Sequence, residues 1–352
     1  MLFDSFRTHH SGARMEQVRM FQKLIIQVPC YNEASSLPVT LAALPRQLPG
    51  IAKVELLIVD DGSQDETISI ARQFGVEHIV RHPKNLGLAR AFMTGIHSCI
   101  RQGADVIVNT DADNQYDASC IPDLIAPILS REAEIVIGAR ETDRIAHFTF
   151  MKKLLQKIGS WVVRRASKTN IPDAPSGFRA FTRDAALKLN VFNNYTYTLE
   201  TIIQAGQKSI PITWIPIRTN DELRPSRLFN SNFQYVRNSL FTIVRIFVVY
   251  KPFRFFLTIG TVLCSIGGLI GLRFLWLFLH GEGDGHIQSL ILTGILIGMG
   301  FQVCMVAFVA DLQSANRRLL EELQYKQRIS DCVSPETSLV SYEPLDREKE
   351  KG

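Results

Sequence analysis

Residues 105–115 read DVIVNTDADNQ, and this stretch determines how the rest of the chain is interpreted. The apolar run Asp105–Asn109 predicts a short buried strand. Asp111 and Asp113 follow that strand directly, and Gln115 adds a further side-chain oxygen two positions later. Two carboxylates on a turn at the end of a strand are able to hold a hard divalent cation, because such cations prefer oxygen ligands. Acidic turns are also common as plain solvated turns, so the surrounding sequence has to separate the two interpretations.

Short apolar runs alternate with helical patterns on both sides of this stretch. Strands are predicted at 23–29, 54–59, 77–80 and 134–137, and helices at 65–74, with Ser63 as N-cap, and at 88–101. This alternation predicts an α/β fold with a mostly parallel sheet. Ligands of such sheets bind beyond the carboxyl ends of the strands. A second acidic turn, Asp60-Asp61, ends the strand at 54–59, so we expect both acidic turns at one shared site.

Two apolar runs in the last third of the chain are long enough to cross a bilayer, which takes ~20 residues. Phe253–Leu279 is interrupted only by Arg254 and Arg273, and Ile287–Ala310 carries no charge. The loop between the runs has no Lys or Arg, whereas basic residues flank their other ends. The positive-inside rule therefore predicts an integral membrane protein with both termini and the catalytic domain in the cytoplasm. The competing interpretation is a pair of buried helices in a soluble protein.

Two basic amphipathic segments, at 150–168 and at 231–252, fit helices that lie on a membrane surface. For the first, a core-facing helix with a solvated basic face stays open. The net charge of +5 is compatible with an anionic membrane or a phosphorylated substrate, and no zinc-finger or aromatic RNA-binding pattern supports a nucleic-acid partner. The six cysteines form no CxxC pair, which is typical of reduced thiols. The first twenty residues lack the apolar segment of a cleavable signal peptide.

Several motifs occur in a fixed order and together carry a resemblance. They are Val28-Pro29-Cys30-Tyr31-Asn32-Glu33, Asp60-Asp61-Gly62-Ser63, Asn85-Leu86-Gly87, Asp111-Ala112-Asp113-x-Gln115, Ser176-Gly177-Phe178-Arg179 and Arg224-Pro225-Ser226-Arg227. From about Leu24 to the second apolar run the chain resembles an inverting family-2 glycosyltransferase of GT-A fold. The order is similar to the polyprenyl-phosphate branch, which includes dolichyl-phosphate mannose synthases and bactoprenol glucosyltransferases. The QxxRW motif of processive family-2 synthases is missing from the sequence, which favours a single transfer.

The resemblance implies a role for each motif. Residues implied to bind the nucleotide-sugar are Pro29, Tyr31, Glu33, Asp60, Asp61, Asn85, Gly87, Asp111 and Ala112, with Asp61 on the base. Mg²⁺ or Mn²⁺ is implied on Asp111, Asp113 and Gln115. Catalytic roles are implied for Asp113, Asp173 and Arg179. Lipid-phosphate binding is implied for Arg140, Ser176, Arg224, Ser226 and Arg227.

Structural alternatives stay open for several of these residues. Glu33 and Asp60 are able to cap helices, Arg140 to form an ion pair, and Ser176 and Arg179 to fix a turn. The proposed nucleophile is a phosphate oxygen that is already anionic, so no general base is required, and Asp173 is expected to orient sugar or metal instead.

The sequence thus predicts an α/β GT-A domain, interfacial helices and two spans. The expected segments are an extension at 1–22, a catalytic domain at 23–230, an interfacial helix at 231–252, the spans within 253–311 and a cytosolic tail at 312–352. The expected reaction joins a sugar, from a UDP-hexose or UDP-N-acetylhexosamine in preference to GDP-mannose, to a polyprenyl phosphate in a bacterial or archaeal cell membrane. The rivals are a polysaccharide or protein acceptor, and a non-catalytic membrane scaffold. Assembly into a homo-oligomer stays open.

Overall fold

The computed structural model describes residues 21–140, 169–191, 197–220, 248–281 and 286–333, together with Arg164, Ser167 and Arg245. Several predictions lie outside these residues. They are the N-terminal extension up to residue 20, most of the amphipathic helix at 150–168, the tail after residue 333, most of the interfacial segment at 231–252, and the three residues Arg224, Ser226 and Arg227.

Within the described residues, seven strands form one sheet in the order β3-β2-β1-β4-β6-β5-β7. The strands are β1 (Phe21–Cys30), β2 (Ile51–Asp60), β3 (His78–Arg81), β4 (Val106–Asn109), β5 (Ile135–Arg140), β6 (Arg179–Thr182) and β7 (Ile212–Ile217). All neighbours are parallel except β6, which runs antiparallel to β4 and β5. The predicted strands are confirmed, whereas β6 and β7 were not predicted from the sequence. The short β6 has no apolar run of its own and forms only because β4 and β5 flank it.

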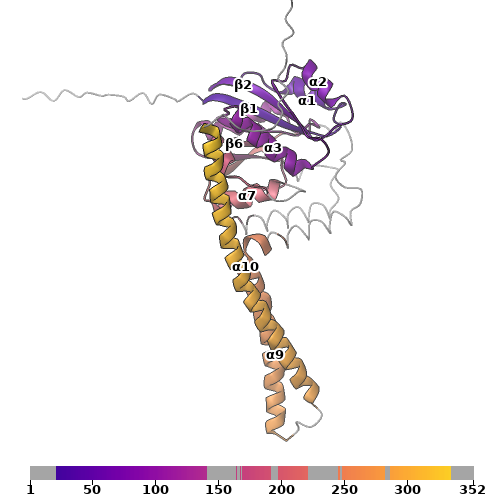
Figure 1. Cartoon of the computed structure of the whole chain (residues 1–352), viewed down its shortest axis with the longest axis vertical. Helices are drawn as coiled ribbons and strands as arrows, with labels where there is room; N and C mark the ends of the chain where they lie inside the picture. Colours follow the sequence, from indigo (N-terminus) through magenta and orange to yellow (C-terminus); the bar gives the residue numbers. More distant parts are fainter. Residues whose placement is uncertain are drawn as a thin grey trace, which may run out of the picture.

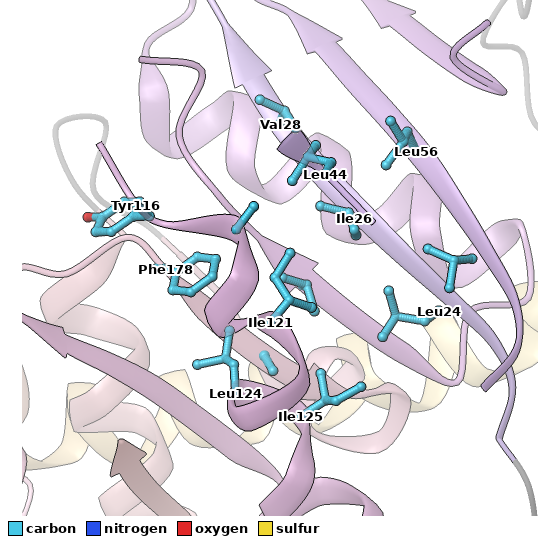
Figure 2. Close-up of a cluster of buried hydrophobic side chains, with 14 of the residues drawn as sticks. Leu24, Ile26, Val28, Leu44, Leu56, Tyr116, Ile121, Leu124, Ile125 and Phe178 are labelled. Atoms are coloured by element: carbon cyan, nitrogen blue, oxygen red, sulfur yellow. The ribbon is translucent and has the colours of Figure 1, made fainter. Parts of the chain in front are cut away.

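Helices cover both faces of the sheet. Because side chains of a strand alternate between faces, Leu24, Ile26 and Val28 of β1 point to one face and Ile25 to the other. The first face packs against α1 (Leu37–Ala43), α2 (Thr67–Gln73), η1 (Ala118–Cys120) and α4 (Ile121–Leu129). Figure 2 shows this cluster, with Tyr116 and Phe178 at one margin. The second face packs against α3 (Leu88–Arg101), α6 (Arg183–Lys188) and α7 (Thr198–Gln207).

The helix expected at 65–74 begins later than predicted, at Thr67, and Ser63 is not its N-cap. The N-cap is Glu66, without a capping hydrogen bond from its side chain. Ser63 Oγ instead accepts a hydrogen bond from the backbone N of Asn32, at 2.9 Å. The Asp65 carboxylate accepts one from Thr67 N, at 3.1 Å. The local contact of Asp65 and a contact from the neighbouring loop, Glu33 N to Thr67 Oγ1, therefore fix the start of α2.

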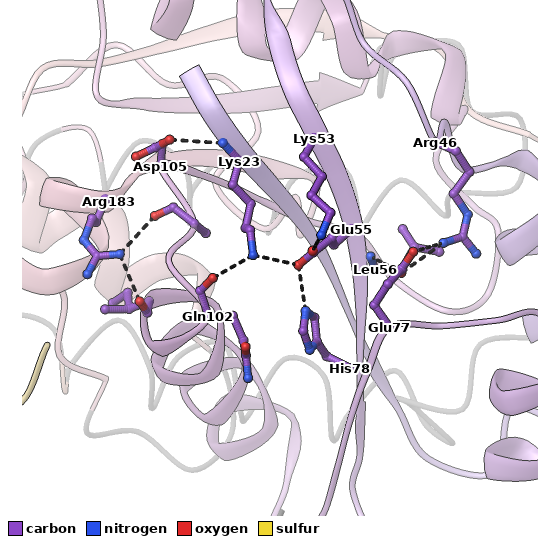
Figure 3. Close-up of polar contacts among 12 residues, drawn as sticks. Lys23, Arg46, Lys53, Glu55, Leu56, Glu77, His78, Gln102, Asp105 and Arg183 are labelled. Atoms are coloured by element: carbon purple, nitrogen blue, oxygen red, sulfur yellow. Dashed lines mark hydrogen bonds and ion pairs between the residues drawn. The ribbon is translucent and has the colours of Figure 1, made fainter. Parts of the chain in front are cut away.

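A cluster of charged side chains surrounds Glu55 toward the amino-terminal half of β1, β2 and β3 (Figure 3). Glu55 is buried and contacts Lys23, Lys53 and His78. Burial by itself raises the pKa of Glu55, but hydrogen bonds from Lys53, His78 and Lys23 outweigh it and lower the pKa to about 2. This cluster lies away from the acidic turns and stabilises the sheet.

Two long helices, α9 (Pro252–Leu279) and α10 (Ile287–Val333), form a hairpin that projects from the α/β domain (Figure 1). Their most apolar windows are only 11% and 17% buried, which is inconsistent with core helices of a soluble protein. Both are candidate membrane spans by length and composition. A Cβ added to Gly260 would lie 2.5 Å from the sulfur of Cys304, and one added to Gly300 would lie 2.5 Å from the sulfur of Cys264. Glycine therefore allows the close crossing of the two helices.

The expected boundary at residue 311 falls inside α10, which continues as one helix to Val333. Its distal part docks on the α/β domain. Arg328 donates to the backbone oxygens of Leu187 and Leu189 at the end of α6, at 3.1 and 2.7 Å. Glu321 forms an ion pair with Lys208, with 3.0 Å between Oε2 and Nζ. The second candidate span and the α/β domain are thus joined by a continuous helix rather than by a separate tail.

Candidate active site at the carboxyl edge of the sheet

The predicted motifs meet at one edge of the sheet because their strands end together. Cys30 at the end of β1 is paired with Asp60 at the end of β2, and Gln27 is paired with Asn109 at the end of β4. The segments 31–36, 60–67, 82–87 and 110–117 therefore emerge side by side. The sequence-based expectation of a shared site for the two acidic turns agrees with this register.

The loop after β1 and the loop after β2 are joined by hydrogen bonds in both directions. Asn32 Oδ1 accepts from Gln64 N at 2.9 Å, while Glu33 N donates to Thr67 Oγ1 at 3.0 Å. Asn32 has a φ of 54°, a left-handed conformation that Asn tolerates better than most residues. Tyr31 is 40% exposed at this edge, whereas Pro29 is buried within β1. Of this pair, only Tyr31 has an exposed side chain.

Glu33 and Asp60 are both buried, and neither carboxylate caps a helix through the contacts described. Glu33 accepts from the hydroxyl of Ser36 at 2.6 Å, and Ser36 is the N-cap residue of α1. Asp60 Oδ1 accepts from Ser63 N at 3.2 Å. Asp60 Oδ2 lies 3.2 Å from Nε of Arg81, close enough for an ion pair but outside hydrogen-bond geometry. Both carboxylates therefore shape the loops at the edge.

Asp61 binds the segment that carries the Asn85-Leu86-Gly87 motif. Its carboxylate accepts from the backbone N of Leu86 and of Gly87, each at 2.9 Å, and pairs with Nδ1 of His82 at 2.7 Å. Gly62 is required beside it, since its φ is 78° and an added Cβ would lie 2.6 Å from the carbonyl carbon of Lys84. The two motifs therefore form one structural unit. Asn85 is exposed on its outside.

Asp111 and Asp113 stand on the turn that follows β4. Asp113 Oδ1 accepts from Gln115 N at 3.0 Å, and Ala112, which is buried, accepts from Thr40 Oγ1 through its backbone oxygen. Burial and then the charge of Asp113 raise the pKa of the half-buried Asp111 to about 7. Two mutually repelling carboxylates on one turn fit a divalent cation. The described residues contain no group of three or more His, Cys, Asp or Glu side chains able to hold a metal, so other oxygens would complete the ligand set.

Gly177 of the Ser176–Arg179 motif lies against Asp111. A Cβ added to Gly177 would come within 3.0 Å of both carboxylate oxygens of Asp111. The hydroxyl of Tyr116 hydrogen-bonds to Asp111 and accepts from Gly177 N at 2.9 Å. A side chain at residue 177 would press on the Tyr197 hydroxyl, at 2.9 Å, and on the Asp111 carboxylate, so glycine leaves both in their positions.

Arg179 does not face this site, and the prediction of a catalytic role for it is not supported. It is fully buried, and its guanidinium donates to the backbone oxygens of Ala174, Ser176 and Thr198, each at 2.8 Å. Burial lowers its pKa to about 10, so it remains charged at neutral pH. Ser176 is fully buried too. Arg179 therefore fixes the turn that places Gly177, which is the structural alternative identified in the sequence.

Arg140 and Asp173 form a buried ion pair at the same edge. Asp173 Oδ2 lies 2.8 Å from Nε of Arg140, and Oδ1 lies 3.1 Å from Nη2. Arg140 Nη1 also approaches Oε1 of Gln115, at 3.4 Å. Gln115, predicted as a metal ligand, thus directs its side-chain oxygen toward Arg140. The structure brings together three residues to which the sequence assigned three separate roles.

A buried polar network beneath Asp111 was not predicted. Gln27 Nε2 donates to Asn109 Oδ1 at 2.8 Å, and Asn109 Nδ2 donates to Gly177 O at 2.8 Å and to Tyr197 OH at 2.9 Å. The signal in the sequence was the amide side chain within each of two otherwise apolar strands. The network holds the backbone of Gly177, the residue that lies against Asp111.

A hollow of about 550 Å³ adjoins the outer side of the turn, between the end of α1 and the start of α4. It is lined by Ala43, Pro45, Gln47, Leu48, Pro49, Asn114, Asp117, Ala118, Ser119, Pro122 and Asn220. None of the predicted site residues lines it.

Comparison with known proteins agrees with this geometry. The family described as Glycosyl transferase family 2 matches residues 25–189. An uncharacterized glycosyltransferase of Mycobacterium tuberculosis is 31% identical over 51% of this chain and 78% of its own length. The chain belongs to glycosyltransferase family 2.

Other relatives of this family-2 glycosyltransferase carry names from the polyprenyl-phosphate branch. The polyprenol monophosphomannose synthase of Mycolicibacterium smegmatis is 24% identical over 67% of this chain and 91% of its own length. The UDP-N-acetylglucosamine–dolichyl-phosphate N-acetylglucosaminyltransferase of Methanococcus voltae is 27% identical over 57% and 87%. The resemblance to this branch is confirmed.

Among solved structures, glucosyl-3-phosphoglycerate synthase of Mycobacterium tuberculosis in complex with phosphoglyceric acid is similar to this family-2 glycosyltransferase with a TM-score of 0.52. The identity is 15%, over 69% of this chain and 85% of that one. At this identity the similarity concerns the fold alone, and it confirms the expected GT-A architecture.

Proposed function

We propose that this family-2 glycosyltransferase transfers one sugar, with inversion at the anomeric carbon, from a nucleotide-sugar to a polyprenyl phosphate. The observation that carries the proposal is the position of Asp111 and Asp113 at the carboxyl edge of a domain on which α10, one helix of the apolar hairpin, docks with its distal part. A donor site for a charged diphosphate and an anchor in a membrane then occur in one chain. The names of the two relatives from the polyprenyl-phosphate branch support the acceptor.

Asp111 and Asp113 would hold Mg²⁺ or Mn²⁺, with Gln115 close by. A bound divalent cation supplies charge neutralisation on the diphosphate as it leaves. Within the chain, the 31–36, 60–67 and 82–87 segments would form the nucleotide side of the site, with Tyr31 presenting its exposed ring. An attacking phosphate oxygen is already anionic, so Asp173 is not needed as a base, and its pairing with Arg140 agrees with an orienting role.

For the acceptor phosphate we propose Arg224, Ser226 and Arg227, with Arg140 at the rear of the site. Asn220 donates from its backbone N to Gln115 O at 2.9 Å and from its side chain to Asn114 O at 2.9 Å. Residue 220 is thus hydrogen-bonded to the turn that carries Asp111 and Asp113. Arg224 follows four residues later, and a chain of four residues spans at most ~14 Å. Guanidinium groups bind phosphate oxygens bidentately, which suits them to a lipid headgroup.

The donor is the finer part of the proposal. We favour a UDP-hexose or UDP-N-acetylhexosamine, as implied by the sequence resemblance, over GDP-mannose. We further propose that α9 and the first half of α10 cross the membrane, with the catalytic domain on the cytoplasmic side, where nucleotide-sugars are available.

The test uses the purified full-length chain, Mn²⁺, polyprenyl phosphate and radiolabelled UDP-glucose, UDP-N-acetylglucosamine or GDP-mannose, each assayed alone. We expect label to enter the lipid fraction from one UDP-sugar, and not when Asp113→Asn replaces the native chain. Label from GDP-mannose would overturn the donor assignment and keep the acceptor. Label that enters only added polysaccharide or protein would overturn the acceptor.

A further inference from the structure

Strand β3 and the residue after it carry two histidine–carboxylate pairs of the same length. His78 Nε2 lies 2.7 Å from Oε2 of Glu55, in the charged cluster of Figure 3. His82 Nδ1 lies 2.7 Å from Oδ1 of Asp61. The first pair lies toward the amino-terminal ends of the strands, and the second lies at their carboxyl ends. None of the sequence motifs included His82.

His82 connects three elements of the nucleotide side. Its backbone N donates to Asp60 O at 2.8 Å, which continues the pairing of β3 with β2. Its ring bridges Asp61 and Thr94 Oγ1 of α3, the latter at 3.0 Å from Nε2. Asp61 in turn accepts from the backbone N of Leu86 and Gly87, directly before α3. His82 and Asp61 are 8% and 3% exposed, so water does not replace these contacts.

The two hydrogen-bond partners of the His82 ring determine which of its nitrogens carries the hydrogen. An ionised carboxylate only accepts hydrogen bonds, so Nδ1 of His82 carries the hydrogen that is donated to Asp61. In the neutral ring, Nε2 then accepts from the hydroxyl of Thr94. Removing the imidazole would leave Oδ1 of Asp61 with the single donor from Leu86 N. The carboxylate would then be free to rotate away from Gly87 N, and the 84–87 segment would lose its fixed position.

We propose that His82 is a positioning residue for the donor nucleotide: it acts through Asp61 to hold the 84–87 segment in its binding conformation. The inference rests on the proposed function, since it requires a nucleoside diphosphate at this edge. The ligand class is a uridine or guanosine diphosphate, the nucleotide part of the sugar donors considered for the proposed function.

The chain offers a matched control for a merely structural role. His78→Leu and His82→Leu each remove a histidine from a pair with a buried carboxylate, four positions apart on one edge strand and its extension. Loss of a buried hydrogen bond lowers stability in both. Only His82→Leu is expected to weaken nucleotide binding. His82→Asn adds a rescue, since an amide NH₂ at this position is able to donate where Nδ1 did.

The experiment measures binding of UDP and of GDP, each with Mn²⁺, to the full-length protein by calorimetry, and thermal unfolding of the same samples. We expect one nucleotide to bind the native protein. His82→Leu should weaken its Kd by ~10-fold, since one buried hydrogen bond is worth about one factor of ten. His82→Asn should stay within ~3-fold of the native Kd, and His78→Leu within ~2-fold. In the transfer assay, His82→Leu should raise the KM for the donor more than it lowers kcat.

Equal weakening by His78→Leu and His82→Leu would overturn the positioning role and leave only a stability effect. An unchanged Kd in His82→Leu would overturn it as well, while the proposed function would stand. If neither UDP nor GDP binds the native protein, the nucleotide-dependent function and the inference both fail.

Discussion

Arg140 donates hydrogen bonds to the Asp173 carboxylate from two side-chain nitrogens, and its backbone N donates to the same carboxylate at 3.1 Å. Residue 140 ends β5, whereas residue 173 precedes the turn into β6. The pair therefore joins two parts of the chain that the sequence separates by 33 residues. It also places a buried charge pair beside Gln115, on the turn that carries Asp111 and Asp113.

Asp173→Asn should lower both stability and turnover. The substitution keeps the size of the side chain but leaves Arg140 as an uncompensated charge, which costs about 3 kcal/mol in a buried pair. Thermal unfolding and the transfer assay measure the two effects. Asp117→Asn is the matched control, since Asp117 pairs with the exposed Arg218 at 3.1 Å. Exposed pairs contribute less than about 1 kcal/mol. An equal loss of stability in both variants would contradict the buried role of the Asp173 pair.

Asp113→Asn should lower turnover by ~100-fold or more, because removal of one metal-binding carboxylate weakens the charge neutralisation of the leaving diphosphate. The fold should be unchanged, since the contact that Asp113 makes among the described residues is a local one with Gln115 N. Turnover is measured across a Mn²⁺ titration, and excess EDTA should abolish native activity. Asp123→Asn, at an exposed position of α4, serves as the control. Native activity that persists in EDTA would exclude the metal.

Glu55→Gln should unfold at a lower temperature than the native protein at pH 7. The folded-state pKa near 2 lies below the ordinary value of 4.5, so ionised Glu55 stabilises the fold above about pH 4.5 and this contribution disappears as the pH falls toward 2. The shift corresponds to about 3 kcal/mol. Melting curves of both proteins from pH 7 down to pH 3 should therefore converge. Glu322→Gln, on the surface of α10, should melt like the native protein throughout.

Arg328→Gln should loosen the attachment of α10 to the α/β domain. Arg328 donates to three acceptors at the end of α6, including Oδ1 of Asn190 at 2.6 Å, and hydrogen bonds from a charged donor contribute about 2 kcal/mol. Limited proteolysis of the distal part of α10 should become faster than in the native protein. Lys326→Gln removes a neighbouring charge whose partner among the described residues is Glu322, in an exposed i,i+4 contact. Equal cleavage rates for the two variants would argue against docking through Arg328.

A cysteine at residue 280, in an otherwise cysteine-free chain, should react with a membrane-impermeant thiol reagent added to intact cells. A cysteine at residue 341 should react only after the membrane is opened. The reason is the absence of Lys and Arg between the two apolar runs and their abundance after the second. The reversed pattern would place the nucleotide-sugar site on the wrong side of the membrane.

The order of strands and helices in the first half of the domain was readable from the sequence. Apolar runs such as Val54–Val59 need only burial to become strands, and the helix at 88–101 was predicted with its observed ends. The acidic turns were readable too, because carboxylates directly after apolar strands must lie at the carboxyl edge of a parallel sheet. The two long apolar runs were readable from composition alone.

Other features depended on contacts between distant residues. The antiparallel β6 is a strand only because β4 and β5 flank it. The buried guanidinium of Arg179 takes its backbone acceptors from two segments, Ala174 and Ser176 before β6 and Thr198 of α7. Asp61, which the resemblance assigned to the base, is directed by His82 and the 86–87 backbone. The sequence by itself determined the types of element, the chemistry of the edge and the family. The tertiary structure alone decided which polar groups face that edge. A buried charge is costly unless it is paired, and its partner can come from any segment that the fold places beside it.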